Sequence, residues 1–230
     1  MGRVMRKLNI LIACEESQAE CQAFRELGHN AFSCDLQKAK VYPGWHIMGD
    51  VTPLLAGRTK FETQNNTHIE VPGWDLIIAH PPCTYLSKVS SVWMVSHGED
   101  PPIGDGWYYS VSIEAWLNIH RYRNMIKARE FFLKCLNADA PFVAVENPIP
   151  MALAKLPRPS CYVCPSWFGV KYTKKTLYWL KNLPPVFAEI DYPNPKEFVK
   201  ASRGKYRSRT FPQLAKAIAK QWSNYILDNI

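Results

Sequence analysis

The stretch that decides the fold is Asp75-Leu-Ile-Ile-Ala-His-Pro-Pro-Cys-Thr-Tyr-Leu-Ser87. It begins with a short apolar run, which is typical of a strand buried on both faces of a parallel sheet. Pro81 and Pro82 end this run, because proline cannot donate a hydrogen bond to a β-ladder. Cys83 follows at once, and the functional groups of open α/β sheets lie just outside the carboxyl ends of the strands. Cys83 is therefore a candidate nucleophile, the alternative being a small buried thiol.

Length and composition indicate one folded domain over residues 1–230. Of these residues 47% are hydrophobic, and a chain of this size can fill one core. No apolar run approaches the roughly 20 residues of a membrane span. Seven scattered cysteines do not make a disulfide framework, and no apolar leader precedes the first predicted strand. These observations favour a reducing compartment, the cytoplasm.

The formal net charge of +8 indicates an anionic partner, and nucleic acid is the commonest. Aromatic rings interleaved with the cations favour contacts with bases and phosphates. The alternative is a solvated basic face. Many of the basic residues come late in the chain: Lys171, Lys174, Lys175, Lys181, Lys200, Arg203, Lys205, Arg207 and Arg209.

The N-terminal part of the chain predicts a Rossmann-like half. Residues 7–13 are typical of a strand, and a turn follows in which Ser17 and Glu20 have the spacing of a capping box. The predicted helix ends at Gly28, and residues 30–34 predict a second strand. A strand, a turn, a helix and a second strand with an acid at its tip form such a half.

The turn after the first strand favours a cationic cofactor. Residues 13–17 contain no glycine, so the usual phosphate-binding turn is absent. Glu15 and Glu16 would repel a pyrophosphate, which disfavours NAD and ATP. S-adenosylmethionine, with its sulfonium and amino groups, suits these carboxylates. Asp35 follows the second predicted strand and is placed to hold ribose hydroxyls. Asp50 follows a third predicted strand and is placed to bind an adenine amino group. The alternative for each aspartate is a turn or helix cap.

The middle of the chain predicts a lid and a second group of polar residues. Residues 84–112 contain glycines, prolines and several aromatic residues, which favours a mobile lid over Cys83. A helix is expected over residues 111–136. Residues 142–148, Phe-Val-Ala-Val-Glu-Asn-Pro, predict another buried strand stopped by proline. Glu146 and Asn147 should therefore reach the same edge of the sheet as Cys83.

Three other segments carry less information. Residues 56–73 predict a polar surface insertion, residues 176–180 a strand, and residues 211–222 an amphipathic helix with Pro212 near its start. Cys161 and Cys164 form a C-x-x-C, but no second pair follows at zinc spacing. We expect no metal site.

Taken in order, these pieces resemble the DNA cytosine-C5 methyltransferase family, and most closely its short bacteriophage and prophage members. His80-Pro-Pro-Cys83 resembles the family's Pro-Cys nucleophile motif, and Val145-Glu-Asn-Pro148 resembles its Glu-Asn-Val motif. Tyr172-Thr-Lys-Lys-Thr-Leu-Tyr-Trp-Leu180 is similar to the basic motif that precedes a late strand. Arg207-Ser-Arg-Thr-Phe-Pro-Gln-Leu-Ala-Lys-Ala-Ile-Ala219 resembles the C-terminal motif that returns to the cofactor pocket.

The resemblance implies a Rossmann-like class I methyltransferase fold, which is an α/β fold with a mostly parallel sheet and helices on both faces. It implies a bacterial host cell as location, DNA as partner and S-adenosylmethionine, or an analogue, as cofactor. The catalytic residues would be Cys83, Glu146 and Asn147. The cofactor-binding residues would be Ala13, Cys14, Glu15, Glu16, Ser17, Asp35, Leu36, Asp50, Val51, His80 and Pro81. The residues in contact with DNA would be Pro82, Thr84, Ser87, Lys174, Lys175, Arg207 and Arg209.

The implied reaction is methyl transfer to C5 of cytosine. The Cys83 thiolate would add to C6 and so make C5 nucleophilic. Glu146 would protonate or hydrogen-bond N3 and the 4-amino group, and Asn147 would orient Glu146 or hold the strand end. A target base in a duplex must first be flipped out, and the aromatic residues of the lid would fill the gap or stack on the base.

Three features depart from the family pattern. Residues 13–17 replace the Phe-x-Gly-x-Gly cofactor loop, and lysines replace the usual arginines of the basic motif. Between Leu180 and Arg207 there is no room for a target-recognition domain. Sequence readout would then come from the lid, a second subunit or another protein. The alternatives are action on a free pyrimidine nucleotide, transfer of another group from a modified cofactor, or a non-catalytic nucleic-acid-binding protein on the same fold.

Overall fold

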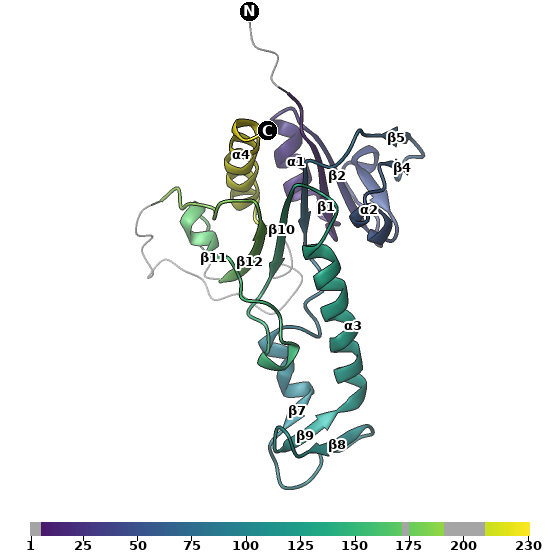
Figure 1. Cartoon of the computed structure of the whole chain (residues 1–230), viewed down its shortest axis with the longest axis vertical. Coiled ribbons are helices and arrows are strands. Elements are labelled where there is room, and N and C mark those ends of the chain that lie inside the picture. The colour runs from purple at the N-terminus through teal and green to yellow at the C-terminus, as the bar shows by residue number, and fades with distance from the viewer. Residues whose placement is uncertain (1–5, 172–174, 191–209) are drawn as a thin grey trace, which may run out of the picture.

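The computed structural model describes residues 6–171, 175–190 and 210–230 (Figure 1). Its centre is a seven-stranded sheet with the order β11-β12-β10-β6-β1-β2-β3. Five neighbouring strands run parallel, namely β10 (Phe142–Asn147), β6 (Leu76–Ala79), β1 (Asn9–Ala13), β2 (Asn30–Asp35) and β3 (His46–Met48). β12 (Thr176–Lys181) is antiparallel to both of its neighbours, β10 and β11 (Cys161–Val163). The predicted α/β class with a mostly parallel sheet is confirmed.

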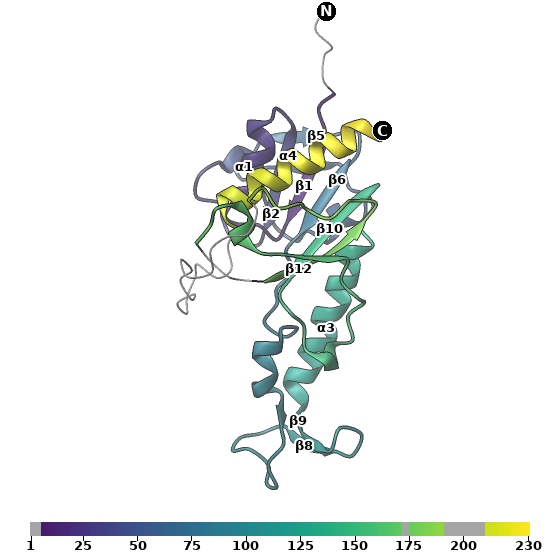
Figure 2. The same ribbon diagram turned by 90° about the vertical axis from the view of Figure 1, so that its left-hand side faces the viewer.

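Helices cover both faces of this sheet (Figure 2). α1 (Ala19–Glu26) and α4 (Pro212–Asp228) share a core with one face, and α2 (Thr52–Leu55) and α3 (Ile119–Leu136) share a core with the other. Alternate residues of β6 belong to the two cores, which is why every residue of this strand is apolar and buried. The buried strand predicted from residues 75–79 is therefore confirmed.

The order of the parallel strands reverses its direction between β1 and β6. If the five parallel strands are numbered by their order in the chain, they lie across the sheet as 3-2-1-4-5. The connection after β1 therefore runs toward one edge of the sheet, and the connection after β6 runs toward the opposite edge. This is the topological switch point of a doubly wound sheet, where ligands of such folds bind. Ala13 is paired with Ala79. The residues that follow each of them, Cys14 and His80, therefore leave the sheet at the same place.

The start of α1 differs from the predicted capping box. The N-cap is Gln18, in the left-handed region with φ 60°, and its side chain makes no cap bond. The Glu15 carboxylate instead accepts hydrogen bonds from the backbone N–H groups of Glu20 at 2.8 Å and Cys21 at 3.3 Å. The prediction for Ser17 was wrong because an acceptor earlier in the turn already satisfies these two donors. Gly28, with φ 88°, ends the helix as predicted.

Residues 84–118 form what we call the extension, and they are not a plain loop. A 3-10 helix, η2 (Lys88–Trp93), is followed by a small antiparallel sheet with the order β7-β9-β8. Its strands are β7 (Val95–Ser96), β8 (Trp107–Ser110) and β9 (Ala115–Asn118). This sheet lies at the end of α3 that is distant from the central sheet in both views (Figures 1 and 2). A lid closed over Cys83 is therefore not the observed arrangement.

The same small sheet explains why the helix predicted over residues 111–136 begins later. β9 pairs with β8 and places Trp116 beside Tyr109, with ring centroids 5.5 Å apart. These cross-strand aromatic contacts favour the strand over a helical turn. α3 then begins at Ile119, where the Asn118 side chain accepts from the backbone N–H of Arg121.

The remaining elements are short, apart from the C-terminal helix. The predicted surface insertion contains the hairpin of β4 (Lys60–Glu62) and β5 (His68–Glu70). Further 3-10 helices are η1 (Pro43–Trp45), η3 (Ala152–Ala154) and η4 (Pro165–Phe168). The strand predicted over residues 176–180 and the C-terminal helix are confirmed as β12 and α4, and α4 runs on to Asp228.

The described part of the chain has neither a membrane-spanning helix nor a metal-binding cluster. None of its helices is long and apolar enough to cross a membrane. Across the same residues, His, Cys, Asp and Glu side chains form no group of three or more that would hold a metal ion.

Candidate functional site

The carboxyl ends of β6 and β10 bring the predicted catalytic residues to one edge of the sheet. The two strands are parallel, and Ala79 is paired with Val145. His80, just beyond β6, and Glu146, near the end of β10, are therefore neighbours at this edge. The buried Asn147 side chain donates a hydrogen bond to the Pro81 carbonyl at 3.2 Å. The expectation that Glu146 and Asn147 reach the edge of the His80–Cys83 segment is confirmed.

His80 links two carboxylates across this edge. Its Nε2 lies 3.0 Å from Oε2 of Glu20 on α1, and its Nδ1 lies 3.4 Å from Oε2 of Glu146 on β10. The other oxygen of Glu146 accepts a hydrogen bond from the Thr176 hydroxyl on β12. Glu20 is fully buried. Side chains from α1, β6, β10 and β12 thus form one connected network.

The charges of this network shift the protonation of its members. Burial alone would lower the pKa of His80, but the Glu20 carboxylate, with help from Glu146, raises it well above the ordinary value of 6.5. Burial, and next the charge of Glu20, raise the pKa of Glu15 from 4.5 to about 7. His80 is therefore held as an imidazolium between carboxylates, while Glu15 gains a proton near neutral pH.

Cys83 is exposed at the start of the turn that follows Pro82. Its carbonyl oxygen accepts hydrogen bonds from the backbone N–H groups of Leu86 and Ser87, both at 3.0 Å. Ser87 also forms an isolated bridge with Pro150, just beyond the Glu146-Asn147 pair. The turn is therefore tied to the ends of both strands, and it presents the thiol to solvent beside the switch point.

The predicted cofactor residues gather around Cys14. Cys14 takes the left-handed conformation, with φ 61°, at a place where glycine is the usual residue. Burial first, and then the carboxylates of Asp35 and Asp50, raise the pKa of the Cys14 thiol to about 12. Both aspartates therefore act on the turn that follows β1. Ala13 is buried in the strand, whereas Glu16 and Ser17 are partly exposed.

Asp35 and Asp50 also have local structural roles. Asp35 accepts a hydrogen bond from the Gln37 backbone N–H at 2.8 Å, and Asp50 accepts one from that of Thr52 at 2.9 Å. The contacts that the structure shows for both are thus those of turn and cap residues. Of their neighbours, Leu36 is exposed and Val51 is buried.

The predicted DNA-binding residues fall into two groups. Pro82 and Thr84 are exposed beside Cys83, and Ser87 is largely buried. Lys175 is exposed, with its Nζ 3.9 Å from the centre of the Tyr162 ring. The other three residues lie outside the described part of the chain, namely Lys174, Arg207 and Arg209.

Sequence reasoning missed the roles of Glu20 and Thr176. Glu20 was expected to serve a capping box, but its side chain reaches across the crevice to His80. The sequence does contain a signal, because Glu20 lies in the first turn of a helix whose N-terminus points at the crevice. No local pattern pairs it with His80, which lies sixty residues further along the chain.

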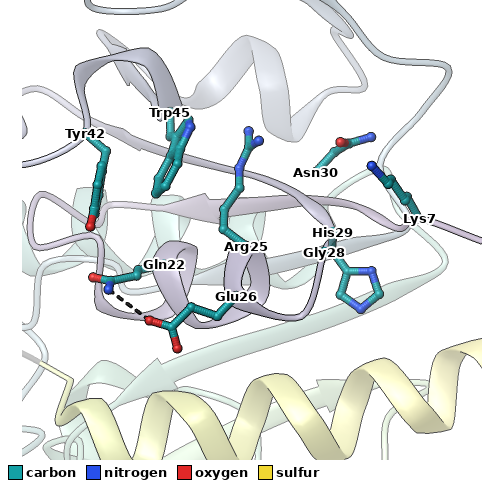
Figure 3. Close-up of a pocket in the computed structure, with 9 residues that line it drawn as sticks. All are labelled: Lys7, Gln22, Arg25, Glu26, Gly28, His29, Asn30, Tyr42 and Trp45. Carbon is teal, nitrogen blue, oxygen red and sulfur yellow. Dashed lines mark hydrogen bonds between the residues drawn. The ribbon is translucent and has the colours of Figure 1, made fainter.

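A cavity of about 460 Å³ lies elsewhere, at the amino ends of β1 and β2 (Figure 3). Tyr42 and Trp45 stack on its wall with ring centroids 4.1 Å apart. The Arg25 guanidinium lies over Trp45 and donates to the Ala31 carbonyl. This cavity is at the edge of the sheet opposite to the switch point, and it contains none of the predicted site residues.

Comparisons with known proteins place few constraints on the chain. No family model and no curated protein matches it. Among solved structures, the chain is similar to a candidate DNA modification methyltransferase encoded within a prophage of E. coli, with 12% sequence identity and a TM-score of 0.38. The match covers 76% of this chain and 46% of that protein, so this chain spans less than half of that length. The chemistry of the site therefore rests on its own residues.

Proposed function

We propose that this chain is a class I, S-adenosylmethionine-dependent methyltransferase that acts on C5 of cytosine in DNA. One observation carries the proposal. The exposed Cys83 lies just beyond the end of β6, the acid Glu146 lies at the carboxyl end of the neighbouring parallel strand β10, and Asn147 ties these two ends together. A thiol that can add to C6 and an acid that can protonate N3 are the groups that addition to a pyrimidine ring requires.

The crevice residues suit a cationic cofactor better than a phosphate-containing one. The first N–H groups of α1, which bind phosphate in dinucleotide sites, are already bonded to the Glu15 carboxylate. The fully buried Oε1 of Glu20 has no hydrogen-bond partner among the described residues. A sulfonium or amino group would meet this acceptor, and Asp35 and Asp50 would hold the nucleoside. When bound, S-adenosylmethionine would supply an electrophilic methyl group.

The protein's own residues would activate the base. The Cys83 sulfur would add to C6, and the electron pair of the C5=C6 bond would move toward N3. Glu146 would give a proton to N3, so that no full negative charge builds on the ring. Asn147 would keep β6 and β10 in register through its bond to Pro81. Thr176 would fix the rotation of the Glu146 carboxyl group.

The extension suits a contact with DNA. Val89, Val92 and Trp93 on η2 are each at least 66% exposed, and they begin six residues after Cys83. Apolar side chains in this position would fill the space left by a base flipped toward Cys83. Lys175 and the net charge of +8 would attract the phosphates. A second copy of the chain or a partner protein would supply any further sequence recognition.

Transfer from labelled S-adenosylmethionine into duplex DNA tests the proposal. The wild type should yield 5-methylcytosine, identified by mass after digestion to nucleosides, whereas Cys83→Ser should yield none. Cys161→Ser, which changes a half-buried cysteine on β11, is the matched control and should retain transfer. Cytidine nucleotides offered in parallel test the second candidate, a free-nucleotide enzyme, which the short interval between Leu180 and Arg207 favours. Methylation that survives in Cys83→Ser would refute the C5 mechanism.

A further inference from the structure

We propose that His80, held by Glu20, is a positioning residue that loads Glu146 with the proton delivered to the base. This inference rests on the proposed function and deepens it. The geometry that carries it is the bridge of His80 between Glu20 and Glu146, at 3.0 and 3.4 Å. A lone carboxylate at the position of Glu146 would have to take its proton from water.

The surroundings of His80 explain why it would hold a proton. Within residues 6–171, 175–190 and 210–230, the charged groups that act on it are acids, namely Glu15 from the turn after β1, Glu20 from α1 and Glu146 from β10. Tyr178 on β12 is buried close to Glu20 and Glu146. With three carboxyl groups and one imidazole in a partly dry site, a cation at His80 reduces the cost of burying negative charge.

In the described part of the chain, His80 is the residue that pairs with the Glu20 carboxylate. The side chain is fully buried, its Oε2 pairs with His80, and its Oε1 has no hydrogen-bond partner among the described residues. An unsatisfied buried carboxylate oxygen is costly. The position of Glu20 on α1 therefore fits a role in fixing the charge and the ring orientation of His80.

The proton movements balance through one cycle. At rest the proton lies on His80, and Glu146 is a carboxylate. As the Cys83 thiolate, which the later elimination releases again, bonds to C6, the proton on Nδ1 passes to Oε2 of Glu146 and a proton passes from Glu146 to N3. His80 becomes a neutral imidazole whose Nε2–H still donates to Glu20. After methyl transfer, the C5 proton leaves to water, the bond from sulfur to C6 breaks, and the N3 proton returns through Glu146 to His80. The 3.4 Å contact is one that would shorten when the base binds.

The test uses three variants of the full chain. Glu20→Gln removes the charge that holds the His80 proton. His80→Asn keeps an amide N–H near the position of Nδ1 but has no titrating proton. Thr176→Val removes a different contact of Glu146, its hydrogen bond from the Thr176 hydroxyl, and is the matched control for a purely structural disturbance. Circular dichroism checks that each variant is folded.

The first readout needs no activity. The ring signals of ¹⁵N-labelled histidine are followed against pH in the protein without cofactor or DNA. His80 is assigned among the six histidines as the signal lost in His80→Asn. The wild-type signal should titrate well above pH 6.5, and in Glu20→Gln it should titrate at a lower pH. A wild-type titration at or below pH 6.5 would overturn the proposal.

The second readout is the pH dependence of kcat for methyl transfer. In the wild type kcat should fall as pH rises through the titration of His80, and in Glu20→Gln this fall should move to lower pH by the interval seen by NMR. His80→Asn should lose about 100-fold in kcat with little change in the Kd for DNA. Thr176→Val should lower kcat without moving the profile.

The outcomes separate the two proposals. If the wild type transfers methyl groups but its profile does not follow the His80 titration, the proton relay is overturned and the methyltransferase stands. If the wild type transfers no methyl group to DNA or nucleotides, the proposed function fails and the relay fails with it. In that second case the NMR titration still shows whether Glu20 holds the charge of His80.

Discussion

Replacing Glu15 with glutamine should change how the stability of the fold depends on pH. Burial, followed by the charge of Glu20, raises the pKa of the Glu15 carboxyl from 4.5 to about 7. A carboxyl whose pKa is higher in the folded state lowers stability as pH rises past the unfolded value, and the full cost is reached above the folded value. At about 1.4 kcal/mol per pKa unit, the full cost is about 3 kcal/mol.

The substitution Glu15→Gln also removes part of the cap at the start of α1. Its carboxylate accepts from the N–H groups of Glu20 and Cys21, and glutamine keeps one of the two acceptor oxygens. Loss of part of the cap costs about 1 kcal/mol at every pH. The variant should therefore be less stable than the wild type at pH 5. The free energy of unfolding of the variant, minus that of the wild type, should then rise by about 2–3 kcal/mol between pH 5 and pH 8.

Urea unfolding at pH 5, 6, 7 and 8 measures this difference. His80 is present in both proteins, so most of its own titration cancels in the comparison. Glu62→Gln, which neutralises an exposed carboxylate on β4, controls for the loss of one negative charge. A Glu15→Gln difference that is flat across this range, or that falls as pH rises, would refute the reasoning.

Three further substitutions test other parts of the structure. Asn147→Ala removes the buried hydrogen bond to the Pro81 carbonyl; urea unfolding should show a loss of about 1–3 kcal/mol, and an unchanged stability would contradict the tie between β6 and β10. Trp222→Ala empties a fully buried site on α4 and breaks the bond to the Pro184 carbonyl, which should cost about 3–5 kcal/mol in the same assay. Trp93→Ala changes a side chain that is 66% exposed, so stability should stay within about 0.5 kcal/mol. Fluorescence anisotropy should show weaker DNA binding by Trp93→Ala, and equal affinity would remove this residue from the proposed DNA contact.

The central sheet was predictable because each of its parallel strands has a strong local signal. Residues 76–79 and 142–145 are apolar runs with a proline two or three residues further on, and a strand that is covered on both faces needs apolar residues at every position. Parallel strands place their carboxyl ends at one edge, so the neighbourhood of Cys83 and Glu146 followed from the fold class alone. No knowledge of the loops was needed for this step.

The extension was predicted less well because its strands are short and because some of them pair with strands that are distant in the sequence. β7 has two residues, and its partner β9 lies some twenty residues later in the chain. Glycine and proline between them favour an irregular loop when the sequence is taken alone. Only the pairing of β9 with both β7 and β8 makes the strand more stable than an early start of α3.

The absence of glycine after β1 is connected with the His80 network. In a dinucleotide-binding half, a glycine turn leaves the first N–H groups of the helix open to a phosphate. Here Glu15 occupies those groups, and Cys14 makes the tight turn with a positive φ. Glu20, in the first turn of the same helix, then directs its carboxylate at His80. The replacement of the glycine turn thus removes a site for an anion. The site that results holds a proton and suits a cation, and the proposed chemistry requires both properties.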